Sequence, residues 1–111
     1  MSGRTVADGF GLVVRFLVRD EAAAAGFDAL VARTVPEIER HEPGTLAYVV
    51  HTVPTEPLVR VFYELYADRA AFDAHERQPH TRHFLAEREQ YLSGVEVTFL
   101  HAGSGVRPAA R

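Results

Sequence analysis

The stretch from residue 61 to residue 84 contains most of the side chains with which this chain could transfer protons. Histidine titrates near neutral pH without help from its surroundings, and a carboxylate buried among apolar groups can have its pKa raised into the same range. Such groups act as general acids and bases when they are held beside a substrate. The candidates in this stretch are Glu64, Tyr66, His75, His80 and His83.

His75 is the first candidate for a catalytic base. It follows Phe72 by three residues on a predicted helix, so the two side chains share a face, and His75 faces a sheet if Phe72 does. The alternative is a histidine whose ring is satisfied by a backbone carbonyl at the end of a helix. The spacing alone leaves both interpretations open.

Glu64 is the second candidate. It alternates with Phe62 and Tyr66 along a predicted strand, so the three side chains share one face of the sheet. A carboxylate between aromatic rings is either desolvated and functional or paired with an arginine. We favour the pairing, with Arg15 on the neighbouring strand as the partner.

Two tyrosines and two further histidines could complete a site. Tyr48 and Tyr66 could hydrogen-bond a substrate oxygen, although aromatic residues on strands more often pack with a polar tip exposed. His80 and His83 could face one way from a helix and, with His75, suggest a metal site. His80 also fits a solvated face in the first helical turn, and a metal would require a carboxylate and supporting hydrogen bonds. We therefore predict no metal.

The hydrophobic pattern predicts four strands and three helical segments around these residues. Apolar side chains alternate along the first strand, and they recur at helical spacing in the segment that follows it. The order is β-α-β-β-α-β with the second helical region split in two, which is the ferredoxin-like α+β fold with a four-stranded antiparallel sheet. The strands are predicted at 10–19, 45–53, 58–67 and 95–101, and the helices from Asp20 to about His41, at 69–76 and at 79–92.

Local signals set the helix ends. Asp20 and Asp68 can each accept a backbone N–H at a helix start, and Pro79 suits the first position of a helix. Pro36 lacks a donor and clashes with the preceding turn, which predicts a kink or break near residues 33–35. Gly94 is predicted to end the last helix.

Both faces of the strand at 58–67 are largely apolar. One layer of helices covers one face of an antiparallel sheet, and the chain has no further element to cover the other. A second copy of the sheet is the simplest cover. The pattern therefore predicts a homodimer.

Composition narrows the class of protein. The chain has 111 residues, a formal net charge of −3 and no cysteine, which favours one domain without disulfides or thiolate chemistry. The absence of a basic run argues against nucleic acid and an anionic membrane surface. The longest apolar stretch is too short to span a bilayer, and we expect a cytoplasmic protein. We predict a flexible start at 1–9, one domain at 10–101 and a flexible tail at 102–111.

Three motifs resemble the antibiotic biosynthesis monooxygenase (ABM) superfamily. They are E-P-G-T-L-A-Y at 42–48, F-Y-E-L-Y-A-D-R-A-A-F-D-A-H at 62–75 and P-H-T-R-H-F at 79–84. The resemblance implies a homodimer of ferredoxin-like subunits whose sheets meet as a β-barrel, with a pocket between sheet and helices in each subunit. Residues that match the strand–helix motif are Glu64, Tyr66, Phe72 and His75. The chain has no tryptophan and no asparagine, and so departs from members that use those residues in the pocket.

The resemblance implies a cofactor-independent monooxygenase of secondary metabolism that acts on an aromatic quinol, anthrone or polyketide-like substrate. Such a reaction needs dioxygen and no cofactor, because the deprotonated substrate is its own reductant. His75 and Glu64 are then the expected catalytic residues. The expected substrate-binding residues are Tyr66, Tyr48, Phe62, Phe72, His83 and Phe84.

Three alternatives stay open on the same scaffold. A non-redox cyclase or isomerase would use the same base without consuming oxygen. A dimeric protein that binds a small ligand would show no chemistry at all. A haem-degrading enzyme would need an axial ligand, which His75 or His80 could supply.

Overall fold

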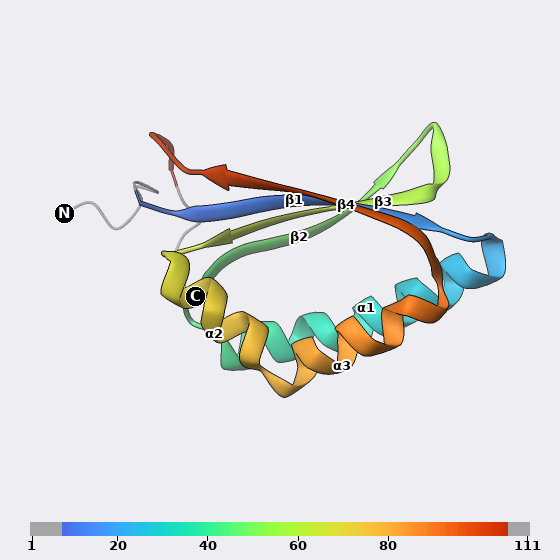
Figure 1. Ribbon diagram of the computed structural model, residues 1–111, viewed down its shortest axis with the longest axis horizontal. Helices are drawn as coiled ribbons and strands as arrows, with labels where there is room; N and C mark the ends of the chain where they lie inside the picture. The colour runs from blue at the N-terminus through green and yellow to red at the C-terminus, as the bar shows by residue number, and fades with distance from the viewer. Residues whose placement is uncertain (1–7, 107–111) are drawn as a thin grey trace.

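Four strands form one antiparallel sheet, and all the helices lie against a single face of it (Figure 1). The structure is a computed structural model that describes residues 8–106. The strands are β1 (Phe10–Val18), β2 (Thr45–Val53), β3 (Glu56–Tyr66) and β4 (Leu92–His101), in the spatial order β2-β3-β1-β4; the helices are α1 (Glu21–His41), α2 (Arg69–Arg77), α3 (Pro79–Glu87) and the 3₁₀ turn η1 (Arg88–Gln90). This confirms the predicted ferredoxin-like fold.

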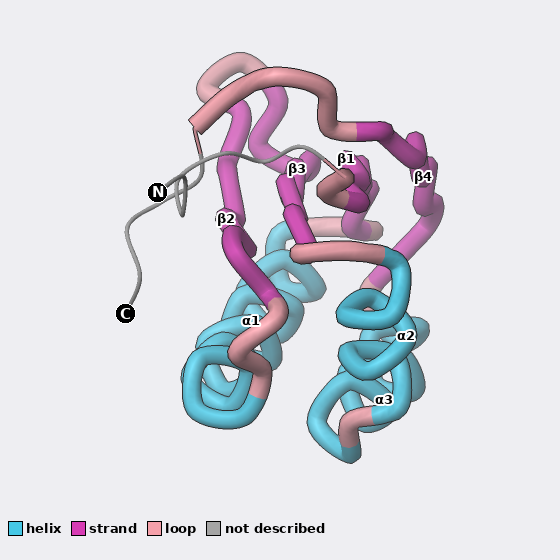
Figure 2. Tube along the Cα trace, turned by 90° about the vertical axis from the view of Figure 1, so that its left-hand side faces the viewer, coloured by secondary structure: helices cyan, strands magenta, loops and turns pink. Residues whose placement is uncertain are grey.

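The helices divide the lower face of the sheet between them. Figure 2 shows α1 beneath the β2 side, whereas α2 and α3 lie beneath the side of β1 and β4. Alternate residues of β1 point down into this layer and pack with aromatic rings from α1, β3 and α3. The centre of this core is formed by Phe16, Phe27, Phe62 and Phe84, whose ring centroids lie 4.6–6.3 Å apart.

Helix α1 continues through Pro36 without a break. Of the kink or break predicted near residues 33–35, the break is therefore wrong. Proline frees the carbonyl four residues before it from its helical partner. Here Ala32 and Pro36 both lie on the exposed side of α1, where water can satisfy that carbonyl. Ile38, beyond Pro36, is still buried in the core.

The helix starts form as predicted, but the last helix ends early. Asp20 accepts a hydrogen bond from the backbone N–H of Ala23, and Asp68 accepts one from Ala71, each at 2.8 Å. Pro79 occupies the first turn of α3. Gly94 does not end a helix, because α3 gives way to η1 at Arg88 and the chain has already entered β4 at Leu92.

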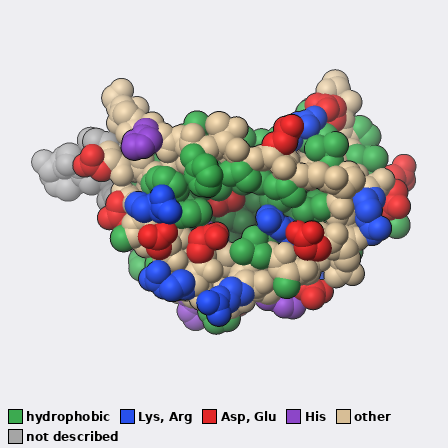
Figure 3. All heavy atoms as spheres, viewed as in Figure 1, with side chains coloured by type: hydrophobic (Ala, Val, Ile, Leu, Met, Phe, Trp, Pro, Cys, Tyr) green, Lys and Arg blue, Asp and Glu red, His purple; other side chains and the backbone are tan. Residues whose placement is uncertain are grey.

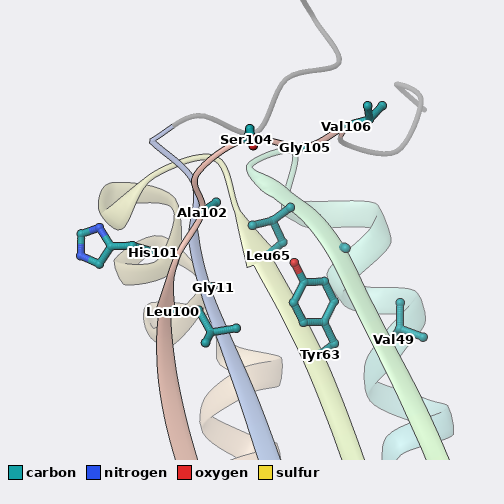
Figure 4. Close-up of a pocket in the computed structure, with 11 residues that line it drawn as sticks. Gly11, Val49, Tyr63, Leu65, Leu100, His101, Ala102, Ser104, Gly105 and Val106 are labelled. Carbon is teal, nitrogen blue, oxygen red and sulfur yellow. The ribbon is translucent and has the colours of Figure 1, made fainter.

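The helices within residues 8–106 leave the upper face of the sheet, as seen in Figure 1, uncovered. Val49, Tyr63 and Val13 form one cross-strand row, and Leu65 lies in the next row. Figure 4 shows Tyr63 and Leu65 on this face, with Leu100 beside them and the segment from Ala102 to Val106 passing over one end. The result is an apolar concave surface that encloses about 580 Å³.

The predicted flexible ends fall mostly outside the described part of the chain. Residues 1–7 and 107–111 lie outside the described residues, and the proposed limits of the domain remain predictions. Among the described residues, no helix is long and apolar enough to cross a membrane.

Candidate functional site

A cavity of about 170 Å³ lies between the sheet and the helices. Figure 3 shows an apolar hollow at this level, with acidic and basic side chains at its edges. Strands β1, β2, β3 and β4 line it from above and α2, α3 and η1 from the other side. Five predicted site residues line it: Tyr48, Glu64, Phe72, His75 and Phe84.

Beside the cavity, one buried carboxylate joins two histidines. Glu42 follows the last residue of α1, and its Oε1 lies 2.7 Å from Nδ1 of His75 on α2. The other oxygen, Oε2, pairs with Nε2 of His80 on α3, and the hydroxyl of Thr45 donates to Oε1 at 2.7 Å. Burial alone would raise the pKa of Glu42, but the hydrogen bonds from His75, Thr45 and His80 outweigh it and hold the pKa below its ordinary value.

This contact fixes which nitrogen of His75 can act as a base. An ionised carboxylate only accepts hydrogen bonds, so Nδ1 of His75 carries the proton and donates it to Glu42. In the neutral ring Nε2 then holds the lone pair. His75 lines the cavity although its side chain is only 6% exposed. A buried histidine oriented by a carboxylate is well suited to general-base catalysis.

Glu64 lies on the same cavity, near the start of β1. Its neighbours across the sheet are Leu12 and Tyr48, and its carboxylate accepts a hydrogen bond of 2.6 Å from the hydroxyl of Tyr66. Burial raises the pKa of Glu64 above its ordinary value, although the bond from Tyr66 and the nearby His75 act in the opposite direction. Glu64 is therefore a desolvated carboxyl group that can hold or release a proton at higher pH than an exposed one.

Tyr48 lies opposite Glu64 on the neighbouring strand and close to His75. Its ring lies 5.7 Å from Phe62 and 5.8 Å from His75, measured between centroids. Burial and the charge of Glu64 raise the pKa of Tyr48 well above its usual range, so its hydroxyl stays protonated and can donate to a ligand. The side chain thus serves as packing and as a polar group at once.

The sequence matches the model of a known family over residues 9–87, which covers most of the domain. That family is antibiotic biosynthesis monooxygenase, ABM. The chain belongs to the ABM family. No curated protein matches it.

Several solved structures share the fold. A candidate antibiotic biosynthesis monooxygenase from Caulobacter crescentus is 26% identical, with a TM-score of 0.81 over 87% of this chain and 92% of that one. Rv0793 from Mycobacterium tuberculosis is 27% identical, with a TM-score of 0.75 over 83% and 92%. A conserved protein from Methanosarcina mazei, at 18% identity and a TM-score of 0.80 over 87% and 95%, shows the fold alone.

Within this ABM domain, two predicted ligand contacts lie deeper than expected. Phe62 and Tyr66 are fully buried and do not line the cavity. Phe62 belongs to the aromatic core, and Tyr66 contributes its hydroxyl to Glu64 from behind the cavity wall. The rings of Phe16 and Phe84 pack against Phe62, and those of Phe72 and His75 pack against Tyr66.

The structure contradicts the predictions for two other side chains, Arg15 and His80, and it places His83 away from the cavity. Arg15 pairs with Glu56 at 2.9 Å on the upper face, since odd-numbered residues of β1 point away from Glu64. His83 is exposed, because Thr81 and Phe84 take the buried face of α3. His80 is not a solvated residue, since its side chain is only 10% exposed and bonds to Glu42.

Several residues of the site gave no clear signal in the sequence. Glu42 stood in a Glu-Pro-Gly sequence that indicates a helix end, and nothing local connects it with His75, 33 residues later. Arg88 falls within the helix predicted at 79–92, and nothing in that pattern indicates that it lines the cavity. Among residues 8–106, no group of three or more His, Cys, Asp or Glu residues is arranged to hold a metal ion.

Proposed function

We propose that this ABM protein is a cofactor-independent monooxygenase that acts on a small aromatic hydroxyl compound. The observation that carries the proposal is His75, a buried histidine whose Nδ1 is held by Glu42 while the ring borders an apolar cavity. The membership of the ABM family supports the same class of reaction.

In the proposed reaction the substrate supplies the electrons for oxygen. Nε2 of His75 takes the proton of a phenolic hydroxyl, and the apolar walls keep the resulting phenolate out of water. The phenolate gives one electron to dioxygen, and the aryloxyl radical and superoxide combine at a ring carbon as a peroxide. Protonation of the peroxide and loss of the ring hydrogen break the O–O bond. One oxygen atom remains as a carbonyl, and the other leaves as water.

The size of the cavity favours a substrate with one ring. An apolar cavity of roughly 150 Å³ is enough for benzene, and this one measures about 170 Å³. A three-ring anthrone would extend beyond the enclosed space toward the exposed side chains of Val97 and Phe99 on β4. Quinols are therefore the first substrates to test.

We also propose that the protein works as a homodimer whose two sheets meet through their upper faces. The apolar rows around Val49, Tyr63 and Leu65 support this arrangement, because β-sheets that pack face to face bury such rows. In this arrangement the cavities lie on the far sides of the two sheets, so each subunit has its own site.

The experiment is oxygen uptake by the metal-free protein with a panel of dihydroxybenzenes and anthrones. We expect uptake above the uncatalysed rate, and a decrease of about 10² to 10⁴-fold in His75→Ala. His83→Ala is the matched control, since this histidine is exposed on α3. It should leave the rate unchanged.

Other outcomes separate the remaining functions. Equal uptake in wild type and His75→Ala would overturn the role of His75 and make Glu64 the next base to replace. Conversion of the substrate without oxygen uptake would identify a cyclase or isomerase. Binding of the substrate without any product would identify a binding protein.

A further inference from the structure

Arg88 borders the cavity from η1, and its Nε atom is buried without a hydrogen-bond partner among the described residues. The side chain as a whole is 22% exposed. The nearest carboxylate is that of Glu89, 4.0 Å from Nε, which is too long for a hydrogen bond, and Glu89 itself is largely exposed. A buried donor without a partner is rare in folded proteins and calls for an explanation.

The rings beneath Arg88 hold the guanidinium in place. Its Cζ lies 5.7 Å from the ring centroid of Phe16 and 5.9 Å from that of Phe84, within the range of a cation–π interaction. Such stacking involves the flat faces of the guanidinium, and its N–H groups lie at the edge of the plane. Those N–H groups form a planar fork that matches a carboxylate.

The charged groups of the cavity are separated along β1. Glu64 lies opposite Leu12, whereas Arg88 lies over Phe16, and the two positions on β1 are about 13 Å apart along the strand. Tyr48 pairs with Glu64 across the sheet and its ring lies near His75, so it lies at the Glu64 end of the cavity. A ligand can therefore present an anion at one end and a hydroxyl group at the other.

We infer that Arg88 recognises a carboxylate on the substrate, so that the substrate class is a one-ring hydroxyarene carboxylate. The inference names the ligand of the cavity described above and rests on the proposal that this cavity is the substrate site. The guanidinium fork binds the carboxylate, and the ring then lies between Phe16 and the acid–base groups His75 and Tyr48.

The test compares two ligands that differ by one carboxylate, hydroquinone and gentisate (2,5-dihydroxybenzoate), by isothermal titration calorimetry. We expect the wild-type protein to bind gentisate at least about tenfold more tightly than hydroquinone, as a charged hydrogen bond would give. Arg88→Gln should remove this preference and leave the affinity for hydroquinone nearly unchanged. Arg82→Gln, an exposed arginine of α3, is the matched control and should keep the preference.

A second variant separates the role of Arg88 in packing from its role in binding the carboxylate. Arg88→Lys keeps the positive charge and an aliphatic stem over the rings, so it should fold even if the glutamine variant does not, and should retain part of the preference. Equal binding of the two ligands by the wild type would overturn the inference, as would a preference that survives in Arg88→Gln. Failure of gentisate to bind at about 10 mM would also overturn it.

The binding test is independent of oxygen chemistry. A preference for gentisate that depends on Arg88, without oxygen uptake, would overturn the proposed monooxygenase and leave the anion site standing. Oxygen uptake that depends on His75, with no preference for gentisate, would overturn the anion site and support the proposed monooxygenase.

Discussion

Two buried carboxylates of this protein have pKa values that move in opposite directions. Glu42 receives hydrogen bonds from His75, Thr45 and His80, which favour its charged form. Glu64 receives only that of Tyr66 among its described hydrogen bonds, so burial dominates and favours its neutral form. The hydrogen bonds to Glu42 therefore outweigh the effect of its burial on the pKa, whereas the hydrogen bond to Glu64 does not.

Glu64→Gln should stabilise the protein increasingly as the pH rises. The unfolded chain releases the proton of Glu64 near the ordinary value of 4.5, whereas the folded chain retains it to higher pH. Between those two values the wild type loses stability with rising pH, and the glutamine variant does not. We expect the variant to be more stable at neutral pH by on the order of 1 kcal/mol.

Urea unfolding from about pH 4 to about pH 8 measures this difference. Tyr66→Phe is the companion variant, because it removes the hydrogen bond that lowers the pKa of Glu64 and should widen the pH-dependent loss. A difference between Glu64→Gln and wild type that is constant over this range would contradict the prediction.

The site residues that could be predicted from the sequence are those in local motifs. His75 and Phe72 are three residues apart on one helix, and the spacing alone places them on a common face. Glu42 and Arg88 enter the site through the packing of α1, α2 and η1, which no local pattern encodes. Arg15 does not pair with Glu64, because the register places it opposite Val61, whose side chain lies on the other face of β3 from Glu64.

At the scale of elements, one close contact joins the start of α1 to the end of the last helical region. A β-carbon added at Gly26 would lie 2.4 Å from Cε1 of Tyr91. The ring of Tyr91 therefore occupies the space that a side chain at residue 26 would need. This explains a glycine inside a long helix, where it would otherwise only reduce stability.

Gly26→Ala should destabilise the protein by about 1 to 3 kcal/mol, because the ring of Tyr91 must move. In a Tyr91→Ala background the same change should stabilise by up to about 1 kcal/mol, since alanine favours a helix. Chemical denaturation of the four proteins in this double-mutant cycle measures the coupling. If Gly26→Ala had the same effect in both backgrounds, the contact would not be the reason for the glycine.

The order of the elements could be predicted because hydrophobic alternation and caps act locally. The ends of the helices and strands depend on tertiary contacts, so the sequence predicts these ends less accurately than it predicts the order of the elements. Pro36 does not interrupt α1, since its exposed side tolerates the lost hydrogen bond. The end of α3 at Glu87 follows from the path into β4, which pairs with β1 from Leu92 onward.

At the scale of the whole molecule, we predict a dimer with twice the 12.3 kDa mass of one chain. Val49→Asp should give a monomer, because the carboxylate would be buried in the apolar upper face between two sheets. Light scattering at micromolar concentration measures the mass. Val95→Asp is the matched control, since this valine is similarly exposed but lies opposite Phe16 on the lower face. A monomeric wild type would contradict the barrel arrangement.

Glu42 connects the end of α1 with α2 and α3 through the rings of His75 and His80. Because its pKa lies below the ordinary value, the charge that stabilises these contacts is lost only as the pH falls through that lower pKa. The segment formed by α2 and α3 is thereby attached to α1 at a point beside the cavity. Local opening of this segment should then be observed as amide hydrogen exchange that becomes faster in acid than the exchange of the sheet.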